Sequence, residues 1–311
     1  MNVKKSIQMI DGALPGVRIK DGLIVLYFHK LFADNSVIPS EVDTQQNTRV
    51  LDFRKSIEYF LEKGYSYVSV DDLSKLDNKK YVMITFDDGY YNNCLALPAL
   101  NEYRVPALFF VSTGHVQNRE AYWWDVLHRE VPNAIERERV KRRLKTYDPQ
   151  SIRDYLLQRF GKDSLSNMND FDRPFTEAEL KDFARQQFVT IGSHTVNHAN
   201  LAHCSFSEAQ YELRESKRYL ESLIGEVTST ISYPNGSVDE RIYVTAKEAG
   251  YGYGFTTNRG YNGIPLAESA HRIKRYIFPD TAGMDFNRLM GMLEKKHSLY
   301  STCVQLHNSL L

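Results

Sequence analysis

The chain has 311 residues, of which 42% are hydrophobic and 25% are charged, so it can form a large core without disulfides or a structural metal. Its 39 basic residues balance its 39 acidic residues, which argues against nucleic acid or an anionic membrane as a partner. The three cysteines are far apart and form no Cys-x-x-Cys pair, so neither a disulfide framework nor a zinc knuckle is indicated.

The same features predict the compartment. The N-terminal residues contain no apolar stretch long enough for a signal peptide, and no later run could span a bilayer. Unpaired cysteines fit a reducing environment. We therefore predict a soluble, cytoplasmic protein with no membrane span. The densest basic run, residues 137–145, is interrupted by Glu138, and we expect a solvated helix face there rather than a phosphate-binding patch.

Short apolar runs alternate with helical patterns along most of the chain. A strand at 23–28 is followed by a helix whose apolar face includes Phe53, Ile57 and Phe60 and which stops at Gly64. This β-then-α order predicts parallel strands covered by helices, hence an α/β barrel or a doubly wound sheet. The remaining predicted elements are strands at 65–70, 81–86, 107–111, 189–191, 228–232, 252–256 and 274–277, and helices ending near 103 and at 175–187, 207–224 and 238–249.

Residues 115–171 break this alternation. They carry Trp123 and Trp124, are rich in charge and show helical periodicity without strands. We predict a helical insertion over one face of a single domain that spans residues 1–311. The two tryptophans are expected to anchor the insertion to the core, with a sugar-stacking platform as the alternative.

Two adjacent carboxylates, Asp87 and Asp88, follow the apolar strand at 81–86 and precede Gly89. The C-terminal ends of parallel strands form the active-site rim in α/β architectures. Successive residues at a strand end point in different directions, so one carboxylate can bind a metal while its neighbour addresses a water. The alternative is a turn in which an aspartate caps the next helix.

Two histidines, His194 and His198, follow the strand at 189–191. Residues four apart share one face of a helical turn, which suits two imidazole ligands on one ion. Together with Asp88 they would make a site of two histidines and one aspartate with open positions for water and substrate. That arrangement is typical of catalytic zinc.

Taken together, these motifs resemble a known family. TFDDG at 85–89 and SHTVNH at 193–198 are similar to the first two motifs of the polysaccharide deacetylases, the NodB-homology domain of carbohydrate esterase family 4. The resemblance covers about residues 22–115 and 175–280. It implies an α/β fold with a distorted (β/α)7 barrel and a divalent metal ion, expected to be Zn²⁺. The implied roles are metal ligation by Asp88, His194 and His198, and general base catalysis by Asp87.

A third motif departs from the common form of the family. SYPNG at 232–236 has Ser232 and Asn235 where R-x-P-Y-G has arginine and tyrosine, which is similar to a Y-P-x-G branch that includes deacetylases of exported amino-sugar polymers. Tyr233 and Asn235 are candidate substrate or oxyanion residues, since a backbone N–H can serve that role. The arginine that orients the catalytic aspartate must come from elsewhere. We expect Arg272, with a surface ion pair as the alternative.

The general acid has two candidates. Classical members of the family carry it in a late L-x-x-H segment, which His307 resembles, whereas the Y-P-x-G branch uses an early Y-H motif. Tyr27-Phe28-His29 resembles the early motif with one residue inserted, and His29 ends a predicted strand as Asp88 does. We therefore predict His29 as the general acid and keep His307 as the alternative.

The resulting hypothesis is a metal-dependent hydrolase that removes an N-acetyl or other N-acyl group from an amino sugar in a glycan or glycan precursor. In this reaction a metal polarises the acyl carbonyl, Asp87 takes a proton from water, and His29 protonates the leaving amine. One alternative is another amide hydrolase, such as a deformylase or a ring-amide hydrolase. A carbohydrate-binding protein without activity is the other, and it has no need of a base beside a metal site.

Overall fold

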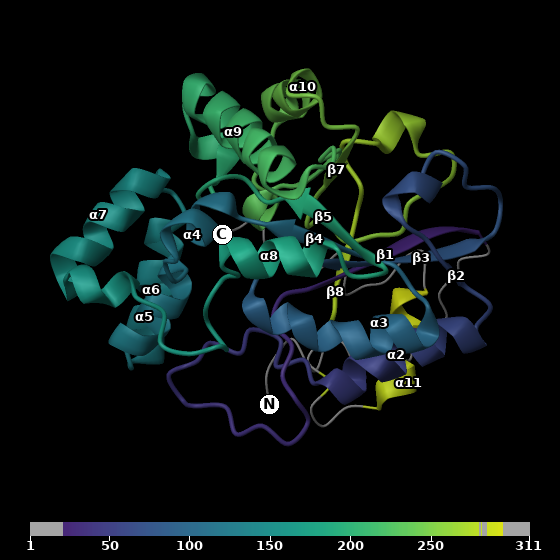
Figure 1. Cartoon of the computed structure of the whole chain (residues 1–311), viewed down its shortest axis with the longest axis horizontal. Coiled ribbons are helices and arrows are strands. Elements are labelled where there is room, and N and C mark those ends of the chain that lie inside the picture. The colour runs from purple at the N-terminus through teal and green to yellow at the C-terminus, as the bar shows by residue number, and fades with distance from the viewer. Residues whose placement is uncertain (1–20, 280, 282–284, 295–311) are drawn as a thin grey trace.

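The computed structural model describes residues 21–279, 281 and 285–294 (Figure 1). Its centre is a sheet in which seven parallel strands follow the order β7-β6-β5-β4-β3-β1-β8 and curl into a half-barrel. A parallel bridge between Phe255 and Ile273 brings the two ends of the sheet toward each other. The strands are β1 (Gly22–Phe28), β3 (Lys80–Phe86), β4 (Ala107–Val111), β5 (Val189–Ser193), β6 (Thr230–Ser232), β7 (Tyr253–Phe255) and β8 (Tyr276–Ile277), with a short β2 (Ser66–Tyr67) beside β3.

Helices surround the outer face of this curved sheet, with α9 and α10 toward the top of the view and α2, α3 and α11 toward the bottom (Figure 1). Two of them begin with the capping boxes Thr176/Glu179 and Ser205/Glu208, which satisfy free backbone N–H groups. The bounds are α2 (Val50–Glu62), α3 (Leu97–Tyr103), α8 (Glu177–Ala184), α9 (Phe206–Ile224), α10 (Glu240–Glu248) and α11 (Phe286–Leu293). The predicted α/β class and barrel-type fold are confirmed.

The interval between β4 and α8 is helical, as predicted. It contains α4 (Thr113–Asn118), α5 (Trp123–Glu130), α6 (Ala134–Leu144) and α7 (Pro149–Phe160), which gather at one end of the sheet (Figure 1). These helices have an apolar cluster of their own, which includes both tryptophans. Most of the basic run is a solvated face of α6, where only Val140 and Leu144 are fully buried, but Lys141 is largely covered and pairs with Asp43 at 2.8 Å.

The core explains why these segments form parallel strands. Every residue of β1 is buried, and the rings of Phe28, Phe86 and Phe109, from three neighbouring strands, stack with centroids 5.1 Å and 4.7 Å apart. A strand buried on both faces needs a continuous apolar run, as these sequences have. Polar side chains that follow such runs therefore emerge together at one edge of the sheet.

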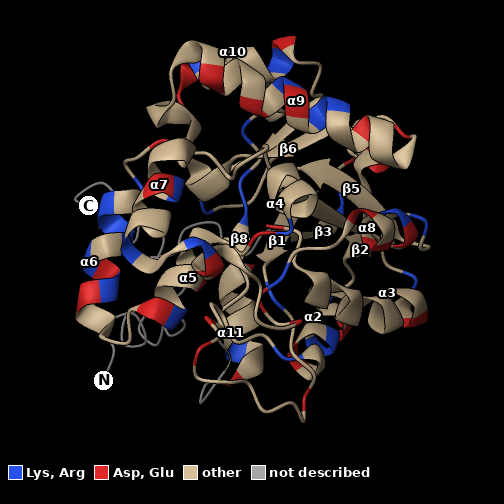
Figure 2. Cartoon of the chain, turned by 60° about the vertical axis from the view of Figure 1, so that its left-hand side comes forward, with Lys and Arg blue, Asp and Glu red and all other residues tan. Residues whose placement is uncertain are grey.

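Charge on the outer helices is mixed in sign (Figure 2). Basic and acidic side chains alternate along α6, α8 and α9, as expected from the balanced composition. Among the residues that the structure describes, none of the helices has both the length and the apolar character needed to cross a membrane.

Candidate metal centre and active site

Three ligand-type side chains meet where β3 and β5 end. The Nε2 atoms of His194 and His198 each lie 3.4 Å from Oδ1 of Asp88, and the three side chains are 2%, 7% and 2% exposed, respectively. Their candidate ligand atoms all lie within 4.8 Å of one another. The structure therefore brings together the three residues predicted to hold a metal.

The hydrogen bonds around these side chains fit a bound cation. Nδ1 of His194 lies 2.8 Å from the carbonyl oxygen of Ser232. Because a carbonyl only accepts, Nδ1 carries the proton and Nε2 presents a lone pair. That lone pair faces Oδ1 of Asp88, which is buried and has no hydrogen-bond partner within the described part of the chain. A cation between these acceptors would offset the cost of burying them, and two imidazoles with one carboxylate suit a zinc-type ion.

The backbone of these loops is unusual. Asp88, Thr195 and His198 adopt φ angles of 76°, 65° and 52°, in the left-handed region that side chains other than glycine rarely occupy. Gly89 follows with φ 80°, and a Cβ there would lie 3.1 Å from the side chain of Val111. Such conformations concentrate at functional sites, where surrounding contacts hold them in place.

Asp87 is paired with a buried arginine. Arg275 is 1% exposed and donates from Nη1 to Oδ1 of Asp87 at 2.7 Å and from Nη2 to Oδ2 at 2.8 Å. Its Nη2 also donates to Oγ of Ser232 at 2.8 Å. Burial is the largest single influence and raises the pKa of Asp87, but the charge and hydrogen bonds of Arg275, together with the nearby His194 and His29, outweigh it and hold the pKa below its usual value. Asp87 is thus an ionised, oriented carboxylate next to the three candidate metal ligands Asp88, His194 and His198.

The prediction that Arg272 orients Asp87 was wrong. The Arg272 side chain is 50% exposed, donates to Glu240 and lies over the ring of Tyr243 at 4.4 Å. Burial alternates along this extended segment, so Ile273 and Arg275 face the barrel interior while Arg272 faces solvent. The signal that could have identified Arg275 was this alternation, with Arg275 in phase with the apolar Ile273.

His29 lines the same cavity as the three candidate metal ligands, as predicted. Its Nδ1 is 2.8 Å from Oε1 of Gln46, and its carbonyl oxygen accepts from Nδ2 of Asn93 at 2.6 Å. The ring packs edge-on against Tyr27, with centroids 5.6 Å apart. The alternative candidate, His307, lies outside the described residues.

The two residues singled out from the third motif have different surroundings. Asn235 lines the cavity, adopts φ 54°, and donates from Nδ2 to Oδ1 of Asn200 at 2.9 Å. Tyr233 is fully buried, and its ring packs against Tyr243 in an apolar cluster between α9 and α10. The Tyr233 side chain therefore fills the core and is not among the residues that line the cavity, and its role as a substrate or oxyanion residue stays a prediction.

The tryptophans serve as a wall of the site and as an anchor. Trp124 packs edge-on against the ring of His198, with centroids 4.6 Å apart, and donates from Nε1 to the hydroxyl of Tyr90 at 2.8 Å. Tyr90 donates to Asp125 at 2.7 Å, and Asp125 forms a buried ion pair with Lys30, also at 2.7 Å. Burial raises the pKa of Asp125 to about 6, against the opposing effect of the lysine. Sequence reasoning identified neither Lys30 nor Asp125.

These side chains enclose one cavity of about 430 Å³. It is open to solvent and large enough for a sugar ring. Its walls come from the barrel edge and from the helical insertion. The lining includes Tyr27, His29, Asp43, Gln46, Asp87, Asp88, Trp123, Trp124, Lys141, His194, His198, Asn235 and Arg275.

A family model described as polysaccharide deacetylase matches residues 74–254, more than half of the chain. The chain belongs to the polysaccharide deacetylase family. The resemblance predicted from TFDDG and SHTVNH is therefore confirmed at the level of the family. The assignment to its Y-P-x-G branch stays a prediction.

Individual relatives are distant but extensive in coverage. The chain is 24% identical over 276 residues to YxkH of Bacillus subtilis (strain 168), provisionally named a polysaccharide deacetylase, covering 85% of this chain and 74% of YxkH. The deacetylase PplD of Streptococcus pyogenes, solved with acetate, is 20% identical with a TM-score of 0.60, covering 90% of this chain and 100% of that one. IcaB of Ammonifex degensii is 17% identical with a TM-score of 0.59, covering 89% and 100%. These structures share the fold.

Proposed function

We propose that this chain is a metal-dependent hydrolase that removes an N-acetyl group from an amino sugar in a glycan or glycan precursor. The observation that carries the proposal is the convergence of the Nε2 atoms of His194 and His198 on the buried Oδ1 of Asp88, with the Asp87–Arg275 pair on the adjacent residue. A binding protein has no need of an oriented general base next to a metal site.

In this proposal, Asp88, His194 and His198 hold a divalent cation, with Zn²⁺ as our candidate. When bound, such an ion polarises the acyl carbonyl and lowers the pKa of water toward about 7. Asp87 accepts a proton from the attacking water, and Arg275 keeps its carboxylate ionised and in position. The water oxygen forms the new bond to the acyl carbon.

The same cavity contains the groups needed for breakdown of the tetrahedral intermediate. Backbone N–H groups near Asn235 are our candidates for stabilising the oxyanion. His29 donates a proton to the sugar nitrogen as the C–N bond breaks, so that the products are acetate and a free amine. Its bond to Gln46 orients the ring within the cavity.

Several features support an amino-sugar substrate. The family is described by its action on polysaccharides, and one structural relative, from Aggregatibacter actinomycetemcomitans, is described as a de-N-acetylase, with 16% identity and a TM-score of 0.61. Trp123 and Trp124 line the cavity, and aromatic rings pack well on the apolar faces of sugars. A cytoplasmic location would favour a nucleotide- or lipid-linked precursor, and it too stays a prediction.

The test is acetate release from a panel of N-acetylated sugars. The panel contains monosaccharides, nucleotide-linked sugars, lipid-linked sugars and short polymers, together with N-formyl and ring-amide compounds. We expect acetate and a free amine from at least one amino sugar, loss of activity after chelation, and recovery on adding Zn²⁺. Turnover confined to N-formyl or ring-amide compounds would assign the chain to another amide hydrolysis.

A further inference from the structure

The sheet holds only the start of the loop that carries both histidines, where the backbone N–H of His194 donates to the carbonyl oxygen of Val111, at the end of β4, at 2.9 Å. The loop leaves β5 at Ser193, and Thr195 and His198 then take left-handed backbone conformations. A loop of this kind relaxes unless other contacts hold it. Because the two imidazoles sit at either end of the loop, its shape sets the distance between their Nε2 atoms.

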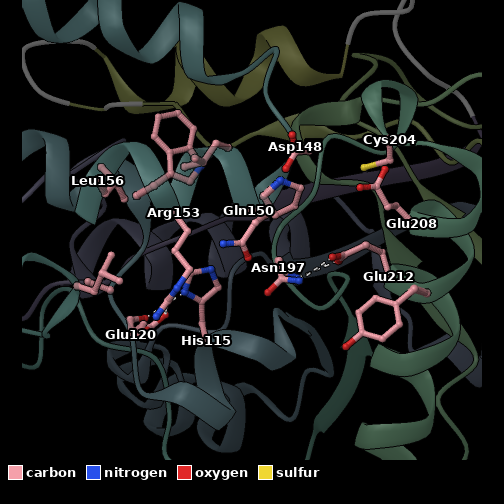
Figure 3. A pocket seen from close by; sticks show the side chains of 16 residues that line it. His115, Glu120, Asp148, Gln150, Arg153, Leu156, Asn197, Cys204, Glu208 and Glu212 are labelled. Carbon is pink, nitrogen blue, oxygen red and sulfur yellow. Dashed lines mark hydrogen bonds and ion pairs between the residues drawn. The ribbon is translucent and has the colours of Figure 1, made fainter. Parts of the chain in front are cut away.

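The backbone N–H groups of Thr113 and Gly114 donate to the carbonyl oxygens of Thr195 and Val196 at 3.1 and 2.8 Å, and helix α9 supplies the side-chain contacts on the loop's N–H groups. Oε2 of Glu212 accepts from the backbone N–H groups of Val196 at 2.8 Å and Asn197 at 2.9 Å, and Oε1 accepts from Nδ2 of Asn197 at 2.7 Å. Glu212 is 4% exposed. Figure 3 shows the Asn197–Glu212 contact at the wall of a second cavity, which is lined by residues of α9 and of the insertion.

A second contact lies one helical turn further along the same face of α9. The hydroxyl oxygens of Ser216 and Ser193 are 2.7 Å apart, and Oγ of Ser193 accepts from the backbone N–H of Thr195 at 3.2 Å. Residues four apart on a helix share a face. The helix therefore holds the loop at Ser193, before His194, and at Val196 and Asn197, before His198.

We propose that Glu212 is a positioning residue of the metal centre: its carboxylate clamps the loop so that His194 and His198 face the same point. The inference rests on the metal centre proposed above and not on the identity of the substrate. The adjoining cavity, of about 240 Å³, would admit water to the loop's N–H groups if the carboxylate were removed. A truncated variant can therefore keep its fold while the loop loses its fixed shape.

The first test is Co²⁺ binding to Glu212→Ala, followed by the visible spectrum of the bound ion. We expect affinity to fall by about 10- to 100-fold, the range for loss of a group that orients metal ligands, and the spectrum to change. The control is Glu215→Ala, which removes a glutamate of the same helix that pairs with Arg218 at the surface. Equal affinities and spectra for the two variants would overturn the clamp. A wild-type chain that binds no Co²⁺ would overturn the metal centre itself.

The second test is rescue. Asn197→Asp places a carboxylate against that of Glu212, which should weaken Co²⁺ binding because like charges repel in a buried site. Adding Glu212→Gln restores a donor–acceptor pair, since the new amide N–H₂ can donate to the carboxylate introduced at position 197 while its oxygen accepts from the backbone. We expect the double variant to regain affinity and the wild-type spectrum. A double variant that binds no better than Asn197→Asp would overturn the pairing.

Discussion

The carboxylate of Asp87 depends on one buried side chain. Arg275 contributes two parallel hydrogen bonds, and such a bidentate pair fixes direction as well as charge. Lysine presents a single charged nitrogen and cannot reproduce this geometry. The orientation of the proposed base is therefore a property of the arginine, and Ser232 contributes to it by accepting from the same guanidinium.

We expect Arg275→Lys to lower kcat by about 10- to 100-fold, because the charge remains while the orientation of Asp87 is lost. Metal content should stay unchanged, since Asp88 and the two histidines are untouched. Arg272→Ala is the matched control, because Arg272 belongs to the same segment and faces solvent. Steady-state kinetics with the substrate found in the acetate assay checks this. Equal losses in the two variants would show that Arg275 has no special role.

At this scale the sequence predicted the groups that carry chemistry better than the groups that support them. Asp87, Asp88, His194 and His198 stand in compact motifs after apolar strands, so their types and spacing were readable. Arg275 is 188 positions from the carboxylate it pairs with. Which arginine reaches Asp87 depends on the phase of an extended segment, and a shift of three residues placed the prediction on the solvent side.

At the scale of elements, a buried network of an ion pair and hydrogen bonds joins the helical insertion to the barrel. The ammonium of Lys30, just after β1, bonds to Asp125 of α5 at 2.7 Å and to the carbonyl oxygen of Asp43 at 2.9 Å. It also lies over the ring of Tyr90 at 4.4 Å. Since Lys30 follows His29 and Asp125 follows Trp124, this network places two walls of the cavity relative to each other.

Removing one partner of this pair should cost more than removing both. We expect Asp125→Ala to lower the free energy of unfolding by about 3–5 kcal/mol, because it leaves the Lys30 ammonium buried without its counter-charge. Lys30→Met combined with Asp125→Leu should recover part of that loss. Arg218→Ala, which breaks the surface pair with Glu215, is the control and should change stability little. Denaturant unfolding measures all four proteins, and a double variant no more stable than Asp125→Ala would contradict the account.

The order of strands and helices could be predicted from the sequence. The buried ion pairs and hydrogen bonds that join these elements could not. Continuous apolar runs such as 23–28 and 107–111 identified parallel strands, and the charged, strand-free interval identified the insertion. The Lys30–Asp125 pair and the Glu212 clamp each join distant segments, and neither has a local pattern. A lone buried charge in a sequence is indistinguishable from an exposed one until its partner is known.

At the scale of the whole molecule, the site is a consequence of parallel strands curled into a half-barrel. β1, β3, β5 and β6 deliver His29, the two aspartates, the histidine loop and Ser232 to one edge, and the segment before β8 adds Arg275. The insertion covers that edge with Trp123 and Trp124. Variation in the insertion can therefore change the cavity wall without altering the metal ligands. In this way one fold can act on different substrates.

The central claim is that Asp88, His194 and His198 hold a divalent metal while Asp87 does not. The most direct measurement is metal content per chain, by mass spectrometry of purified protein loaded with Zn²⁺ and freed of excess ion. We predict about one ion per chain for wild type and for Asp87→Asn, whose turnover should nevertheless fall by about 10²-fold or more. His194→Ala should lose the ion. A His194→Ala protein with full metal content and full activity would contradict the account.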